Sequence, residues 1–239
     1  DTVNKFEKVY FFEEGIKSGG IAEHLSSRIK NSVKQFNIYA IDDTFVPSAK
    51  VASALKKAKI PVAMLRMDTF EDYLTILRTL TKITGKTENY EQFGENAKSE
   101  IEQIISGGKR ENNPKILFVR SGSSYSSAKA KKADDNFAAK ILEDFGCINI
   151  ADKAEVLLDN LSAEVILKEN PQYIFVSVMG DYDNSKAYMQ ELLAKKEYAS
   201  LDAVKNGRVY FLPKELFQYK PCGRWAESYR YISSILNNE

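Results

Sequence analysis

The sequence is poor in the residues on which metal sites and nucleophilic catalysis depend. Its 239 residues include one histidine, His24, and two cysteines, Cys147 and Cys222. A histidine-built zinc site or a Ser-His-Asp triad would have to rest on His24 alone. The two cysteines lie far apart without metal-ligand spacing, and we interpret them as unpaired thiols. We therefore predict no metal site, no cofactor and no catalytic residue, and we expect that the chain is not an enzyme.

Several motifs and patterns that define other protein classes are also missing. No apolar run approaches the 18 residues that a membrane-spanning helix needs. Neither Gly-x-x-x-x-Gly-Lys-Ser/Thr nor Gly-x-Gly-x-x-Gly occurs, so a phosphate loop or a dinucleotide fold is not indicated. The net charge is +1, which gives no electrostatic reason to expect nucleic acid as a partner. Glu13 and Glu14 are adjacent on a predicted turn and point apart, which disfavours a paired acid site.

The residues that are present describe a protein with a buried core and alternating elements. Hydrophobic residues make up 44% of the chain and charged residues 28%, the usual balance of a globular protein. Short apolar runs alternate with helical patterns, which predicts parallel strands joined by right-handed crossovers. Strands are expected at residues 8–12, 36–41, 60–67, 115–120, 148–150, 173–179 and 208–212. We therefore predict an α/β fold of two lobes, each with a parallel sheet flanked by helices.

A long helical stretch at residues 68–106 separates the two sets of strands. Apolar residues recur at spacings of three and four from Phe70 to Ile83, and Gly85 then ends the first helix. A second helical run follows and reaches Gly107 and Gly108. We predict a first β-α-β-α-β lobe at 1–67, this helical bridge, a polar linker at 107–114 and a second α/β lobe at 115–239.

Loops at the carboxyl ends of the predicted strands are the candidate ligand sites, because open parallel sheets bind ligands there. Ser121–Ser127 offers several hydroxyls with Lys129, Lys131 and Lys132 just behind, which suits an anionic or oxygen-rich ligand. The alternative is a solvated, flexible loop. Arg224 is either an anion clamp in a cleft or a surface arginine beside a core tryptophan, Trp225.

From about Asp43 to Glu239, the chain resembles the helical-backbone substrate-binding proteins of ABC importers that take ferric siderophores, haem or cobalamin. The residues that carry the resemblance are Asp43–Pro47, Ile60–Val62, Thr69–Gly85, Phe145–Asp152, Asn170–Val176, Met179–Gly180, Leu201–Arg208 and Phe217–Tyr229. The family's bridging helix falls on residues 68–106.

The resemblance implies a metal-chelate or tetrapyrrole ligand bound between the lobes and delivered to a membrane permease. It also implies an extracytoplasmic protein, either periplasmic or anchored as a lipoprotein. The second-lobe loops that would hold the ligand supply the predicted binding residues, which are Ser121, Ser123, Tyr125, Met179, Asp181, Tyr219, Lys220 and Arg224.

Residues 1–47 resemble a different family, the transketolase-like C-terminal domain of 1-deoxyxylulose-5-phosphate synthase. The resemblance is carried by Val9–Gly20 and Phe36–Pro47. It suggests a chimera joined near Asp43, with a shortened first lobe whose exposed sheet edge could pair with a second copy in a homodimer. The alternative function is then an engineered or recombined protein that folds without ligand or catalytic activity, cytoplasmic if expressed recombinantly.

Overall fold

The computed structural model describes residues 8–13, 35–40, 53, 57, 67–108, 112–122 and 127–237. The predicted first lobe lies largely outside these residues, including its first helix, expected at 21–29, and nearly all of its strand at 60–67. Of its second helix, expected after Pro47, only Ser53 and Lys57 are described, and both are helical. The chain divides into two compact units. The first unit is Asp1–Ile101 with Tyr219–Ala226, and the second unit is Glu102–Gln218 with Glu227–Glu239. The predicted lobe and linker boundaries stay predictions.

The first unit contains a parallel strand pair and most of the helical stretch. Its described elements are β1 (Lys8–Glu13), β2 (Gln35–Ala40), α3 (Phe70–Thr84), α4 (Glu88–Tyr90), the π-helix η2 (Glu91–Glu95), the start of α5 (Asn96–Gly108), the 3-10 helix η5 (Cys222–Arg224) and the start of α12 (Trp225–Asn237). β1 and β2 pair in parallel, as the first two predicted strands require.

Helix α3 begins and ends at residues suited to these positions. The Thr69 side chain accepts a hydrogen bond from the Asp72 backbone N–H, and the Asp72 carboxylate accepts one from the Thr69 N–H. This capping box satisfies two of the free donors at the helix start. Gly85 ends the helix with φ of 70°, a conformation that costs glycine little. The predicted stop at Gly85 is confirmed.

The π-helix η2 was not expected from the sequence, which predicted one continuous helical run there. Gly94 lies in η2, and a Cβ on it would come within 3.2 Å of the Tyr90 ring and 3.3 Å of Leu74. The Tyr73 hydroxyl donates a hydrogen bond to the Phe93 carbonyl at 3.1 Å. These contacts hold η2 close against α3, because glycine gives room and Tyr73 satisfies a carbonyl at the irregular turn.

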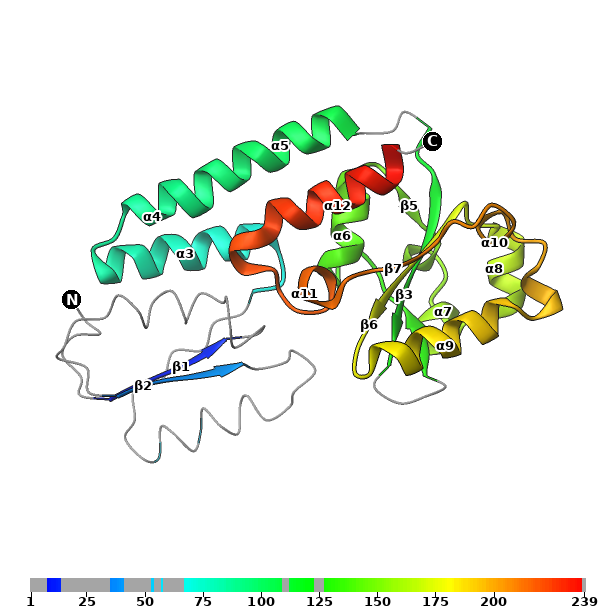
Figure 1. Ribbon diagram of the computed structural model, residues 1–239, viewed down its shortest axis with the longest axis horizontal. Helices are drawn as coiled ribbons and strands as arrows, with labels where there is room; N and C mark the ends of the chain where they lie inside the picture. The colour runs from blue at the N-terminus through cyan, green and yellow to red at the C-terminus, as the bar shows by residue number, and fades with distance from the viewer. Residues whose placement is uncertain are drawn as a thin grey trace. The chain divides into compact units, whose positions relative to one another are not determined.

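The second unit is a mixed β-sheet with helices around it (Figure 1). Its remaining elements, besides the ends of α5 and α12, are β3 (Lys115–Ser121), β4 (Ala128–Ala130), α6 (Phe137–Asp144), β5 (Ile148–Asn149), η3 (Ile150–Asp152), α7 (Val156–Asp159), α8 (Ala163–Glu169), β6 (Tyr173–Val178), α9 (Tyr182–Leu193), η4 (Lys196–Tyr198), α10 (Asp202–Lys205), β7 (Val209–Phe211) and α11 (Lys214–Phe217). The strand order is β4-β3-β6-β7, and β5 pairs with the start of β3.

The four predicted strands of this half are confirmed, but the sheet is not wholly parallel. β3 pairs in parallel with β5 and β6, and β6 pairs in parallel with β7. β4 pairs antiparallel with the end of β3 and was not predicted. The sequence suggests Ser162 as a side-chain cap of α8, but Ser162 occupies the N-cap position without a side-chain cap bond.

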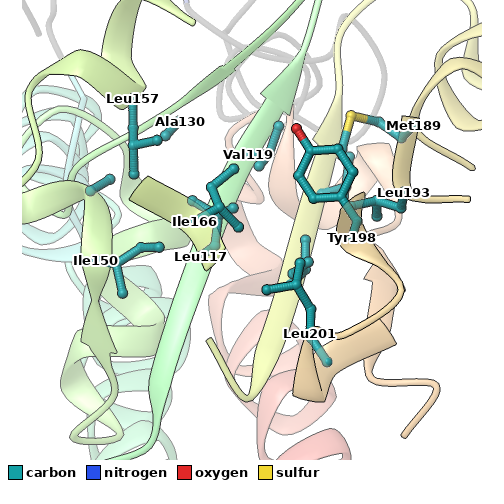
Figure 2. Packing of buried hydrophobic residues seen from close by; sticks show 14 of the residues in the cluster. Leu117, Val119, Ala130, Ile150, Leu157, Ile166, Met189, Leu193, Tyr198 and Leu201 are labelled. Atoms are coloured by element: carbon teal, nitrogen blue, oxygen red, sulfur yellow. The ribbon is translucent and has the colours of Figure 1, made fainter. Parts of the chain in front are cut away.

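One face of the sheet carries a cluster of buried apolar residues. Leu117 and Val119 of β3 lie opposite Ile174 and Val176 of β6, and all four belong to this cluster. Helices α7, α8 and α9 cover them with the side chains seen in Figure 2, among them Leu157, Ile166, Met189 and Leu193. Strand residues alternate between faces, so this register gives β3 and β6 one common buried face.

The opposite face of the sheet is lined by aromatic residues. Phe118 of β3 lies opposite Phe175 of β6, and both are fully buried. The Tyr173, Phe175 and Tyr210 rings stack at centroid distances of 5.6 to 6.4 Å. Because both faces of β3 and β6 are buried along most of their length, these strands form the centre of the second unit.

We expect a matched pair of valine truncations to separate the core from the surface. Val176→Ala removes two methyl groups from a fully buried position and should lower the free energy of unfolding by about 2–3 kcal/mol. Val156→Ala makes the same change at a side chain that is 45% exposed and should change it by less than about 0.5 kcal/mol. Urea unfolding of both variants measures the difference, and equal losses would contradict the packing of β6.

Candidate functional site

The loops that follow β3 and β6 are tied together at the carboxyl ends of these strands. The Met179 backbone N–H donates to the Ser121 carbonyl at 3.0 Å, and the Ser185 hydroxyl donates to the Gly122 carbonyl at 3.2 Å. The Lys214 ammonium donates to the Gly180 carbonyl. These bonds hold the two loop starts side by side, as expected for a ligand site at the end of a parallel sheet.

Gly122 lies at a crowded position, where a side chain would collide with Ser127 unless Ser127 moved. Its backbone N–H donates to the Ser127 carbonyl at 2.6 Å, which closes the turn between β3 and β4. A Cβ at this position would lie 1.8 Å from the Ser127 hydroxyl oxygen. Ser123 and Tyr125, two predicted binding residues, lie outside the described residues.

Three predicted binding residues fall at these strand ends, in different environments. Ser121 is 1% exposed, and its hydroxyl has no hydrogen-bond partner. Met179 is half-buried, and Asp181 is exposed. The Asp181 carboxylate accepts a hydrogen bond from the Asn184 N–H at 2.8 Å and so caps α9. Ligand contact by these residues stays a prediction.

The other three predicted residues belong to the first unit. Tyr219 is 37% exposed, and Arg224 is exposed. Lys220 is 5% exposed, and its ammonium lies 3.7 Å from the Asp68 carboxylate. A lysine is rarely this buried unless it is paired, so Asp68 explains its position. Whether these residues join Ser121, Met179 and Asp181 in one site stays a prediction.

Trp225 and its neighbours form an aromatic cluster beside this loop. The Trp225 ring is 5.6 Å from the Phe70 ring and 6.4 Å from the Tyr73 ring. Trp225 is 1% exposed, so it is a core tryptophan. This agrees with the interpretation of Arg224 as a surface arginine beside a core tryptophan. Burial and the nearby Cys222 thiol raise the pKa of Tyr73 well above the ordinary tyrosine value.

Arg120 and Ser177 have side chains suited to a binding site, and the sequence analysis did not identify either of them. Arg120 lies opposite Ser177 in the β3–β6 pairing and opposite Lys129 in the β3–β4 pairing. The three residues form a row across three strands, on the face opposite the buried cluster. The signal was present in the sequence, because alternation places Arg120 on the same face as Phe118.

The described part of the chain lacks two features that would indicate other functions. No three His, Cys, Asp or Glu side chains gather there as metal ligands. No helix in the same residues combines the length and the apolar character needed to cross a membrane.

Comparison with known proteins identifies relatives of the same fold. The sequence profile of a family described as "Periplasmic binding protein" matches residues 41–216. An ABC transporter substrate-binding protein from Listeria monocytogenes EGD-e aligns with 98% of this chain and 99% of its own, with 16% identity and a TM-score of 0.74. A search among curated protein sequences found no match.

Two further solved structures carry named ligands in their descriptions. The periplasmic haem-binding protein RhuT from Roseiflexus sp. RS-1, in apo form, aligns with 97% of this chain and 98% of its own, with 15% identity and a TM-score of 0.71. The catecholate-siderophore binding protein VctP from Vibrio cholerae aligns with 98% of this chain and 94% of its own, with 14% identity and a TM-score of 0.60.

These findings agree with one of the two resemblances and not with the other. They support the ABC-importer binding proteins, which are not enzymes and are extracytoplasmic. They give no support to a transketolase-like domain, a chimera, a cytoplasmic location or a homodimer. The shortened first lobe stays a prediction.

We expect the Asp68–Lys220 pair to act as one unit in stability. Lys220→Met leaves the Asp68 carboxylate without this cation, and should lower the free energy of unfolding by about 1–3 kcal/mol. Asp68→Asn should cost a similar amount by removing a carboxylate that lies beside a buried ammonium. The double variant should cost less than the sum of the two, because it contains neither charge. Urea unfolding of all four proteins measures the coupling, and strict additivity would show that the pair contributes nothing.

Tyr73 should make the protein less stable in alkali. Its raised pKa keeps it protonated in the folded state, while the unfolded chain ionises near pH 10. Above that pH the unfolded state binds fewer protons, so the stability that Tyr73 contributes falls as pH rises. Tyr73→Phe lacks this effect. The free energy of unfolding that the wild type has in excess of the variant should therefore shrink between about pH 9.5 and 11. Thermal unfolding across this range tests it, and a constant difference would contradict the burial of the hydroxyl.

Proposed function

The chain belongs to the periplasmic binding protein family, and we propose that it is the solute-binding protein of an ABC importer for iron-siderophore, haem or cobalamin-like ligands. The observation that carries the proposal is the family match over residues 41–216, together with alignment of nearly the whole chain to substrate-binding proteins. At 14–16% identity the solved relatives establish the fold alone, so the ligand class is the proposed part.

The proposed cargo is a metal chelate or tetrapyrrole. Of the aligned proteins, one is described as binding haem and another a catecholate siderophore. Both ligands carry a chelated metal: haem is a planar complex, and the siderophore complex is rich in oxygen atoms. The strand-end loops described above supply backbone and side-chain polar groups, of the kind that orient such a ligand. In this proposal the metal enters already chelated, as cargo.

The proposed partner is the membrane permease of the same importer. A binding protein of this kind works outside the cytoplasm, as a periplasmic protein or a surface lipoprotein, and passes its ligand to the permease. The eight binding residues predicted from the sequence remain the proposed ligand contacts, with Tyr219 and Arg224 the exposed members of the first unit.

Titration calorimetry with haemin, a ferric catecholate, a ferric hydroxamate and cyanocobalamin tests the proposal. We expect saturable one-to-one binding of at least one of these ligands, because the proposed protein carries one ligand molecule to the importer. Arg224→Ala should then weaken binding about 10-fold or more if Arg224 contacts the ligand.

Arg230→Ala is the matched control, because Arg230 is also an exposed arginine but lies outside the predicted set. It should leave the affinity within about twofold, as surface residues away from a contact do. A folded wild-type protein that binds none of the four ligands would contradict the proposed function. Equal losses in both arginine variants would show a general charge effect instead of a contact.

A further inference from the structure

Two cationic residues of the second unit occupy directly opposite positions on neighbouring strands. Arg120 of β3 and Lys129 of β4 are directly opposite in an antiparallel pair, so their side chains share one face of the sheet. Their neighbours in the pairing, Val119 and Ala130, both belong to the buried cluster on the other face, which confirms the assignment. Within the described residues, neither cationic side chain forms a hydrogen bond or an ion pair.

This arrangement is unfavourable in the isolated protein. Like charges directly opposite each other on a sheet are destabilising. Arg120 is also half-buried, which weakens the screening of its charge by water. Sites that break a local rule without compensation inside the fold are typically functional ones.

The third member of the row is Ser177 of β6. It is fully buried, and its hydroxyl has no hydrogen-bond partner. It is opposite Arg120 in the parallel pairing, on the same face as Arg120 and Phe175. Its burial prevents contact with a ligand, but it is the residue paired with Arg120 across the two strands, and its hydroxyl oxygen can accept a hydrogen bond.

We propose that Arg120 and Lys129 bind an anionic oxygen group of the ligand, with Ser177 as a positioning residue for Arg120. The fixed donors of a guanidinium match a carboxylate, a phosphate or a catecholate oxygen pair, and Lys129 adds a second charge from the exposed side. The row lies at the last pairs of β3 and β6 before the strand-end loops. The inference rests on the proposed function for the identity of the ligand, and narrows it to a negatively charged chelate.

The two cations and the serine can be tested separately from folding. Lys129→Gln relieves like-charge repulsion, so we expect its melting temperature to stay equal or rise by about 1–3 °C. Ser177→Ala removes an unsatisfied buried hydroxyl and should likewise not destabilise the protein. A loss of ligand affinity in these variants therefore cannot come from unfolding. Lys196→Gln, at an exposed lysine of η4, is the matched control.

The first measurement uses iron-free citrate as an anionic probe, followed by NMR at the Arg120 Nε–H and the Ser177 backbone amide. We expect saturable shifts in the wild type and the Lys196→Gln control. The shift at Ser177 should vanish in Arg120→Gln, and Ser177→Ala should move the Arg120 Nε–H signal and weaken citrate binding about 2- to 10-fold. Glycerol, a neutral polyol, should produce no shift.

The second measurement compares chelate affinities by calorimetry. Arg120→Gln should weaken binding of an anionic chelate, haemin or a ferric catecholate, by about 10- to 100-fold. It should leave a cationic or neutral chelate within about twofold. Unchanged affinity for anionic chelates, with unchanged citrate shifts, overturns the inference and leaves the proposed function standing. Citrate shifts without binding of any chelate support the anion row and defeat the proposed function, whereas a wild type that responds to neither overturns both.

Discussion

The parallel pairing of β3 with β6 is the constraint on which the rest of the second unit depends. Six successive residue pairs join the strands, from Ile116 opposite Tyr173 to Ser121 opposite Val178. A slip of one residue would exchange the aliphatic side chains of one face with the aromatic side chains of the other, so the different packing on the two faces fixes the register. β7 then adds to β6, and both β4 and β5 add to β3. The same pairing decides which loops meet at the carboxyl ends of the strands.

Much of this unit could be predicted because β3 and β6 are continuous apolar runs. A strand that is buried on both faces is apolar at nearly every position. All residues of Tyr173–Val178 are buried, and every one except Ser177 is apolar. β4 could not be predicted, because Ala128–Ala130 has little strand propensity and forms a strand through its pairing with β3. The π-helix η2 also gives no clear signal, since one extra residue in a turn hardly changes a helical pattern.

The candidate site was harder to predict than the fold, since it depends on contacts between residues far apart in sequence. Lys220 was expected to contact a ligand, yet its side chain is buried, and its ammonium lies 3.7 Å from the carboxylate of Asp68, a residue far from it in the sequence. Asp181 has a clear local role as the cap of α9, and a cap signal is readable from sequence. Local signals therefore identified the helix stop at Gly85 and the strands of the second unit, whereas the environment of each charged side chain required the folded structure.

The row formed by Lys129, Arg120 and Ser177 shows how function can be recognised as a break in a pattern. Along one face of β3 and β6, the pairs change from Ile116 with Tyr173, to Phe118 with Phe175, to Arg120 with Ser177. Had packing alone been selected, the third pair would also be apolar, because a buried hydroxyl without a partner and a half-buried charge both cost stability. The cost is confined to the last pairs before the strand ends, so the core formed by the first two pairs is unaffected. A ligand that supplies the missing negative charge would recover this cost on binding, which makes the unfavourable arrangement of the free protein a source of affinity.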